Sequence, residues 1–256
     1  MRDKIIELLQ KFPFLHRAAK FCYWQIKKAE AMFFGIAIYE KYWQRRHLIS
    51  KGDWSDDGDW VNGYWESRHH PHRKFLIEKL TAQPIESALE IGANCGPNLY
   101  LIAKKFPDAR LEGIDINEIA VERGKNFLKK EGVDNVILRT ASIGALKDYP
   151  DKSFDIVFSD AVLIYVGPDK ITDTVREILR IARKKIFFLE WHEVSGDDSD
   201  GMGIYHFGHW KRDYIKLLAN FIDENRVRAT KIPDNLWPGK DWSRMGYLIE
   251  TIIETR

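Results

Sequence analysis

The chain has 256 residues, of which 45% are hydrophobic and 30% are charged, enough for an apolar core and a well-solvated surface. Its formal net charge is only +2, so nothing global points to a nucleic-acid partner. Cys22 and Cys95 lie far apart and form no metal or redox spacing, which indicates a reducing compartment. Acidic Asp3 and Glu7 near the N-terminus argue against a signal peptide, and the longest apolar stretch, 31–39, is about half of a membrane span. We expect a cytoplasmic protein, either soluble or peripheral to the inner face of a membrane.

Residues 1–50 are basic and read as helical. Apolar residues recur at helical spacing from Ile5 to Phe12, and a second amphipathic stretch covers 19–42. Two interpretations stay open: the aromatic and basic side chains rest on an anionic membrane surface, or the segment packs as a helical cap or a homodimer contact. A polar linker with an acidic run follows at 50–63. We therefore divide the chain into an N-terminal extension, 1–63, and a main domain, 64–256.

The main domain alternates short apolar strands with amphipathic helices after Pro84, which is typical of a parallel sheet covered on both faces. Strands are predicted at 87–91, 110–116, 136–139, 154–159 and 185–191. Helices are predicted at 72–81, 97–105, 118–131 and 169–183. The last third predicts a glycine-rich loop at 195–208, a helix at 210–219, and two strands at 228–232 and 247–254.

A glycine loop follows the first strand of this pattern. The strand ends in Glu90-x-Gly92-x-Asn94-x-Gly96 and leads directly into a helix. The two glycines permit a sharp turn and a close approach to a ligand, and Asn tolerates a left-handed backbone between them. A dinucleotide fingerprint would need glycine in place of Asn94 and Pro97, and Glu90 would repel a pyrophosphate.

An acidic residue ends the second strand. Asp115 stands 23 residues after Gly92, where a carboxylate can accept both ribose hydroxyls of an adenosine. The alternative interpretation of Asp115 is a helix N-cap, since a helix follows.

These motifs resemble those of class I S-adenosylmethionine-dependent methyltransferases between about Tyr64 and Glu190. Glu90–Gly96 matches the first motif in a variant with Asn at the middle position, and Phe154–Leu163 matches the motif of the fourth strand. One departure is Arg183-Lys-Lys185, which replaces the usual Lys-Pro-Gly-Gly turn. The resemblance implies a Rossmann-like α/β fold with a seven-stranded, mostly parallel sheet whose last strand is antiparallel, and S-adenosylmethionine as cofactor. The cofactor-binding residues that it implies are Tyr64, Arg68, Glu90, Gly92, Ala93, Asn94, Gly96, Asn98, Asp115, Ile116, Ala141, Ser142, Asp160 and Ala161.

Methyl transfer from a sulfonium requires that donor and acceptor are aligned and shielded from water. A base is needed only if the acceptor loses a proton. His192, directly after the fifth strand, is the candidate base, with an ordinary loop histidine as the alternative; Tyr165 is expected to line the same pocket. The histidines at 205–214 favour a substrate lid over a metal site, because their spacing with His192 and Glu193 matches no zinc or iron motif. We expect the histidine-dense segment 68–73 to be a solvated helix entrance, that is, a solvent-exposed segment at the start of a helix.

All nine tryptophans lie outside 66–190, in the regions that build the acceptor pocket in this family. Aromatic walls suit a sugar face or another flat molecule, although packing of the extension explains the same residues. We expect a small or medium acceptor, methylated at a hydroxyl of a saccharide or a related metabolite. A non-catalytic S-adenosylmethionine-binding protein and a membrane-associated scaffold are the alternatives.

Overall fold

The computed structural model describes residues 13–48, 59–206, 208–237 and 240–253. The helical stretch predicted from Ile5 to Phe12 and most of the predicted polar linker lie outside the described residues.

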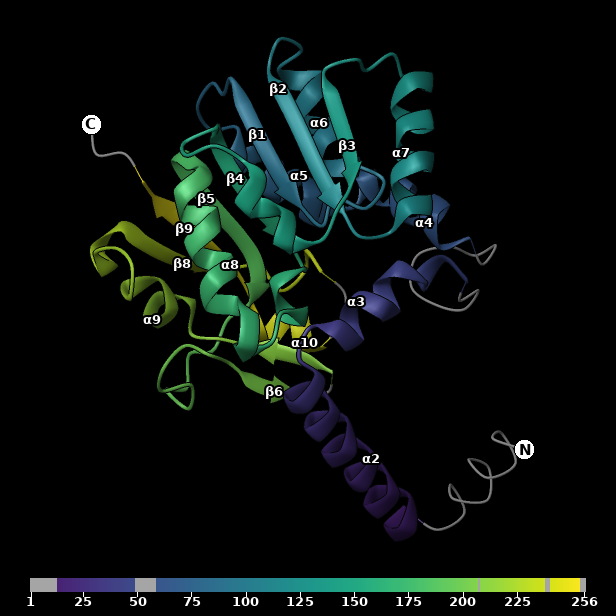
Figure 1. Cartoon of the computed structure of the whole chain (residues 1–256), viewed down its shortest axis with the longest axis vertical. Coiled ribbons are helices and arrows are strands. Elements are labelled where there is room, and N and C mark those ends of the chain that lie inside the picture. Colours follow the sequence, from purple (N-terminus) through teal and green to yellow (C-terminus); the bar gives the residue numbers. More distant parts are fainter. Residues whose placement is uncertain (1–12, 49–58, 207, 238–239, 254–256) are drawn as a thin grey trace.

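A seven-stranded sheet forms the centre of the main domain (Figure 1). The strands run in the order β3-β2-β1-β4-β5-β9-β8, and β1 to β5 are mutually parallel. Strand β9 is antiparallel to both of its neighbours, β5 and β8. The bounds are β1 Ser87–Ile91, β2 Arg110–Asp115, β3 Val136–Thr140, β4 Phe154–Asp160, β5 Ala182–Trp191, β8 Val227–Lys231 and β9 Gly246–Ile252. The predicted fold class is therefore confirmed.

Helices cover both faces of the sheet, and alternate strand residues serve the two cores. Ala88 packs with one core and Leu89 with the other. One face is covered by α4 Trp60–Glu66, α5 Pro71–Leu80, α6 Pro97–Lys105 and α7 Glu118–Lys130, and the opposite face by α8 Pro168–Ile181 and α9 Tyr214–Ala219. Short 3₁₀ turns are η1 Arg46–Leu48, η2 Ser67–His69, η3 Ile143–Asp148, η4 Leu163–Tyr165 and η5 Glu224–Arg226.

The last third differs from the prediction. A hairpin, β6 Ile204–His206 and β7 His209–Lys211, ends the glycine-rich loop, so Trp210 lies in a strand and not in a helix. The helix α9 begins only at Tyr214, because Asp213 caps the backbone N–H groups of the first turn. A further helix, α10 Lys240–Met245, was not predicted.

Strand β5 also begins earlier than predicted, at Ala182, where the sequence favours a helix through residue 183. Arg183 and Lys184 both form ion pairs with the buried Asp155 of β4, which neutralises the basic charges at this end of the strand.

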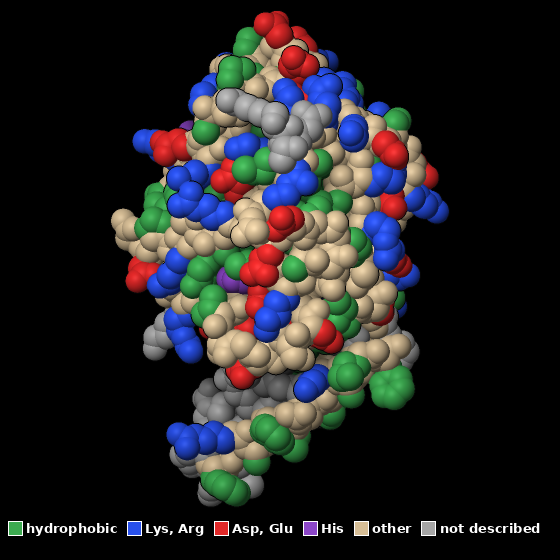
Figure 2. Space-filling view, turned by 90° about the vertical axis from the view of Figure 1, so that its left-hand side faces the viewer, with side chains coloured by type: hydrophobic (Ala, Val, Ile, Leu, Met, Phe, Trp, Pro, Cys, Tyr) green, Lys and Arg blue, Asp and Glu red, His purple; other side chains and the backbone are tan. Residues whose placement is uncertain are grey.

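The N-terminal extension consists of two helices with different surroundings. Helix α2 Pro13–Phe34 projects away from the body of the molecule (Figures 1 and 2), whereas α3 Ala37–Gln44 lies against it. Gly35 joins them at φ +56°. The boundary expected between residues 63 and 64 falls inside α4. Within the described residues, no helix is long and apolar enough to cross a membrane.

Candidate cofactor and acceptor site

The glycine loop joins β1 to α6 at the carboxyl edge of the parallel strands. Gly92, Asn94 and Gly96 all have positive φ, at +72°, +53° and +83°. A Cβ on Gly92 would lie 2.3 Å from Cγ2 of Val162, so the turn demands glycine for space as well as for conformation. The left-handed backbone predicted for Asn94 is confirmed.

Asp115 ends β2 directly beside this loop. Its carboxylate accepts hydrogen bonds from the backbone N–H groups of Asn94, at 2.7 Å, and Asn117, at 2.8 Å. Burial nevertheless outweighs these bonds and raises the pKa of Asp115 to about 6. The N-cap of α7 is Asn117, not Asp115, which leaves the Asp115 carboxylate at the strand end. The N-cap alternative for Asp115 is therefore wrong.

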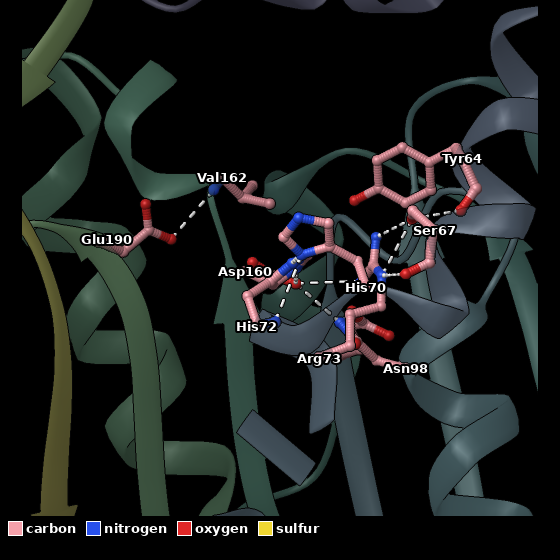
Figure 3. Close-up of polar contacts among 10 residues, drawn as sticks. Tyr64, Ser67, His70, His72, Arg73, Asn98, Asp160, Val162 and Glu190 are labelled. Carbon is pink, nitrogen blue, oxygen red and sulfur yellow. Dashed lines mark hydrogen bonds and ion pairs between the residues drawn. The ribbon is translucent and has the colours of Figure 1, made fainter. Parts of the chain in front are cut away.

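A buried polar network lies under the loop (Figure 3). One Asp160 oxygen, Oδ2, lies 3.1 Å from Arg73 Nη1, 3.1 Å from Asn98 Nδ2 and 3.4 Å from His72 Nε2. Asn98 also donates to Glu90 Oε1 at 2.7 Å, so one amide joins the two carboxylates. These residues come from α5, β1, α6 and β4, which places the network where the four elements meet.

Burial and neighbouring side chains together set the charges of this network. It raises the pKa of Glu90 to about 8, against the opposing effects of Asn98 and Arg73. It lowers the pKa of His72 to about 4, against the attraction of Asp160. Burial also opposes ionisation of Asp160, but His72, Arg73 and Asn98 outweigh it and hold the pKa of Asp160 below its usual range. Two buried oxygens, Glu90 Oε2 and Asp160 Oδ1, accept no hydrogen bond from the described residues.

The loop after β4 is held by a carboxylate of β5. Glu190 is fully buried and accepts hydrogen bonds from the backbone N–H groups of Val162, Leu163 and Ile164 at 3.0 to 3.2 Å (Figure 3 draws the first). The loop starts with Ala161 in a left-handed conformation at φ +59°. The buried carboxylate thus fixes a segment that would otherwise leave three backbone donors without partners.

A cavity of about 470 Å³ opens above these elements. On one side it is lined by the glycine loop, by Asp115 and by the residues that follow β3 and β4. On the other side the walls are mainly aromatic and come from α3, α4, β5, the β6–β7 hairpin and the segment around α10: Tyr39, Trp43, Trp60, Trp191, His209, Trp237 and Trp242.

The aromatic wall is a connected cluster of rings. The ring centroid of Tyr165 lies 4.9 Å from that of Trp43 and 5.1 Å from that of His209. The ring of His209 in turn lies 4.6 Å from that of Trp191. Trp237 and Trp242 stack at 4.0 Å. The main-chain oxygen of Trp43 accepts a 2.7 Å hydrogen bond from Asn117, so α3 is tied to the segment just after Asp115. Helix α3 is therefore part of the site and not a separate unit.

Most residues predicted for the site gather at this cavity. Ten line it: Tyr64, Gly92, Asn94, Asp115, Ile116, Ala141, Ser142, Asp160, Ala161 and Tyr165. Four others are buried directly beneath or beside the glycine loop: Glu90, Ala93, Gly96 and Asn98.

Arg68 does not line the cavity, contrary to the prediction. Its guanidinium donates to the main-chain oxygen of Trp65 and to Glu66, and lies 4.9 Å from the Trp65 ring. Arg68 belongs to the turn η2, before α5, and local partners hold it there.

His192 is also outside the cavity. Side chains alternate along a strand, so Trp191 faces the cavity and His192 faces the opposite core. There the ring of His192 packs 5.0 Å from Tyr247, and its Nδ1 accepts from the backbone N–H of Tyr214. The ordinary structural interpretation of this histidine fits its position.

Two residues of the segment expected to be a solvated helix entrance are buried and line the cavity. His72 and Arg73 are each only 2% exposed. Arg73 precedes the buried Ile77 by four positions and Leu80 by seven, which is the spacing of one helix face. This periodicity predicts that Arg73 lies on the buried face of the helix. The many charged and histidine residues of the segment favour the opposite interpretation, a solvated surface.

Comparisons with known proteins agree with this geometry. Residues 88–185 match the family described as "Methyltransferase domain". An uncharacterized protein of Rickettsia prowazekii is 27% identical over 165 residues, which cover 59% of this chain and 65% of that protein. A demethylmenaquinone methyltransferase of Halalkalibacterium halodurans is 27% identical over 160 residues, 61% of this chain and 64% of that enzyme. The matches thus span just under two thirds of these relatives.

Among solved structures, magnesium protoporphyrin IX methyltransferase from Synechocystis, crystallised with S-adenosylmethionine, has a TM-score of 0.57 at 13% identity. The match covers 86% of this chain and 97% of that one, and shows a common fold. Residues 88–185 therefore resemble a methyltransferase domain, and the chain shares its fold with a methyltransferase that binds S-adenosylmethionine.

Proposed function

We propose that the protein transfers the methyl group of S-adenosylmethionine to a hydroxyl of a small or medium acceptor, a saccharide or a related metabolite. The observation that carries the proposal is one cavity in which Asp115 and the glycine loop face an aromatic wall. Donor and acceptor bound on these two sides would be aligned and shielded from water, which is what methyl transfer requires.

The residues beneath the loop fit the donor. The cofactor supplies an activated methyl group on a sulfonium. Asp160 Oδ1 is a buried oxygen on a cavity-lining side chain, suited to accept from the ammonium of an amino acid. Arg73 supplies a buried positive charge at the same edge, and Asp115, which lines the cavity, would accept hydrogen bonds from the ribose hydroxyls.

The aromatic wall fits a ring-shaped acceptor that carries hydroxyl groups. Glu40 lies in this wall beside Tyr39 and Trp43, and burial raises the pKa of Glu40. A carboxylate set among aromatic faces offers stacking and a hydrogen-bond acceptor together. Tyr165 and His209 are the neighbouring groups that can exchange a proton with an acceptor hydroxyl, in place of His192.

Calorimetric titration with S-adenosylhomocysteine, with NADH as a control ligand, tests the proposal. We expect micromolar binding of the first and none of the second. A folded protein that fails to bind S-adenosylhomocysteine would contradict the cofactor assignment. Once binding is established, saccharide acceptors can be screened for methyl transfer, and absence of transfer to any of them would narrow the proposal to other hydroxylated rings.

A second candidate function, a non-catalytic scaffold, is favoured by one observation, the exposed helix α2. Under that proposal, residues 1–50 make the functional contact, with a membrane or with a second copy in a homodimer. Deleting residues 1–34 tests this candidate, since α3 stays in place. A non-catalytic scaffold would lose its function with this segment, whereas methyl transfer that persists after the deletion would identify an enzyme.

A further inference from the structure

Helix α2 exposes large hydrophobic side chains to solvent. Phe14, Phe21, Met32 and Phe33 are 81%, 64%, 66% and 86% exposed. Figure 2 shows hydrophobic and basic side chains together on this projecting arm. Such exposure of several aromatic residues on one element marks an interaction surface.

The exposed apolar residues of α2 share one face. At about 100° per residue, they occupy a sector of roughly 140°, in which Gln25 is the single polar side chain. We call this sector the apolar face of α2; it comprises Phe14, Ala18, Phe21, Cys22, Gln25, Ile26, Ala29, Met32 and Phe33, all exposed. Arg17 and Lys28, also exposed, lie along one border of this face.

The charge of α2 selects the partner. Between residues 13 and 34 the sequence has four basic residues, Arg17, Lys20, Lys27 and Lys28, and one acidic residue, Glu30, which gives 4 − 1 = +3. Glu30 is already paired with Lys27 at 2.5 Å. An apolar face bordered by basic residues is complementary to a bilayer with anionic headgroups, where each basic residue adds to the attraction.

A second copy of the chain fits this face poorly. A helix of 22 residues is about 33 Å long, and a face about 10 Å wide would bury roughly 330 Å². A stable interface buries about 800 Å² per partner. Two such arms would also bring together segments with the same positive charge.

We propose that α2 lies in the headgroup region of an anionic bilayer, with its apolar face toward the acyl chains. The C-terminal end of α2 is fixed to the domain, because Gly35, which follows it, is buried against Asp169 of α8. Immediately after Gly35, α3 contributes Tyr39 and Trp43 to the cavity. A bilayer-bound arm therefore holds the aromatic wall near the membrane surface.

Sedimentation with phospholipid vesicles tests this inference. We expect the full chain to bind vesicles of equal phosphatidylcholine and phosphatidylglycerol, and to bind pure phosphatidylcholine much less. Binding should weaken as salt screens the basic border of the face. The double variant Phe14→Ser/Phe21→Ser should reduce partitioning about tenfold or more, because two aromatic side chains no longer enter the bilayer.

Tyr23→Ser is the matched control for the single variant Phe21→Ser. Tyr23 is an exposed aromatic residue of the same helix on the side opposite the apolar face, so its loss should leave binding nearly unchanged. Equal effects of Tyr23→Ser and Phe21→Ser, or no binding to the anionic vesicles, would overturn the proposal. A dimer seen by light scattering without lipid, and lost in Phe14→Ser/Phe21→Ser, would assign the face to a second copy instead. Titration of each variant with S-adenosylhomocysteine keeps this result independent of the proposed enzymatic function.

Discussion

The carboxyl groups of the site differ in their hydrogen-bond partners and in their pKa values, although all are buried or partly buried. Asp115 accepts from two backbone N–H groups and reaches the cavity, whereas Glu90 lies beneath the loop and shares Asn98 with Asp160. The difference in surroundings separates their pKa values, about 6 for Asp115 and about 8 for Glu90. Near neutral pH this favours a charged Asp115 and a protonated Glu90.

We predict that Asp115→Asn weakens binding of S-adenosylhomocysteine by about 1–3 kcal/mol, because charge-assisted hydrogen bonds to the ribose are lost. Calorimetric titration measures the change. Asp148→Asn, at an exposed aspartate, is the control and should bind as the unaltered protein does. Unchanged affinity in folded Asp115→Asn would remove Asp115 from the ribose site.

Glu90 gives a prediction for stability against pH. Its pKa in the folded protein, about 8, is above its ordinary value of 4.5, so the folded state binds the extra proton between these values. Stability from this group is present at low pH and is lost as pH rises toward 8, by up to about 1.4 kcal/mol per pH unit. Glu90→Gln should flatten this loss in chemical unfolding without cofactor, while Glu78→Gln, at an exposed position of α5, should retain it. Parallel pH profiles for Glu90→Gln and the unaltered protein would contradict the assignment.

At the scale of elements, two buried charged residues hold the loop after β4. Glu190 binds its backbone N–H groups, and Arg212 donates to the main-chain oxygens of Leu163 and Val166. The same loop brings Ala161 and Tyr165 to the cavity. Glu190 of β5 and Arg212, which follows β7, thus satisfy both backbone donors and backbone acceptors of this loop.

We predict that Glu190→Gln lowers the free energy of unfolding by about 1–3 kcal/mol. An amide NH2 group replaces one carboxylate oxygen, and this group cannot accept a hydrogen bond from the backbone N–H groups of the loop. Urea unfolding measures it. Ser159→Ala removes just one of the donors to Glu190 and should lower the free energy of unfolding by less. If Glu190→Gln were as stable as the unaltered protein, the loop would not depend on this carboxylate.

At the scale of the whole molecule, the N-terminal extension divides between α2 and α3. Helix α2 leaves most of its described side chains exposed, but Arg46, just after α3, is 2% exposed and its guanidinium lies 5.3 Å from the Trp60 ring. The expectation of a helical cap thus describes α3, whereas the expectation of contact with a membrane surface stays a prediction that concerns α2.

Deleting residues 1–34 should therefore change Tm by less than about 3 °C and preserve binding of S-adenosylhomocysteine, since little apolar area is lost from the core. Deleting residues 1–48 should lower Tm clearly and weaken binding about tenfold or more, because the cavity loses Trp43 and Trp60 loses its cover. Scanning fluorimetry and titration compare the two deletions. Equal behaviour of both would show that α3 is not part of the site.

Sequence periodicity and local backbone chemistry by themselves determined the parallel sheet, the glycine loop and the position of Asp115. These features depend on residues close together in the chain: alternating apolar strands, glycine and asparagine at left-handed positions, and an acid at a strand end. The tertiary structure decided those features that depend on contacts between residues far apart in the chain. It brought His72 and Arg73 to Asp160, placed the α3 aromatic residues over the cavity, and turned His192 away from it. Side-chain orientation at a strand end, and the burial of a charged residue, depend on partners far away in the chain, which local patterns do not specify.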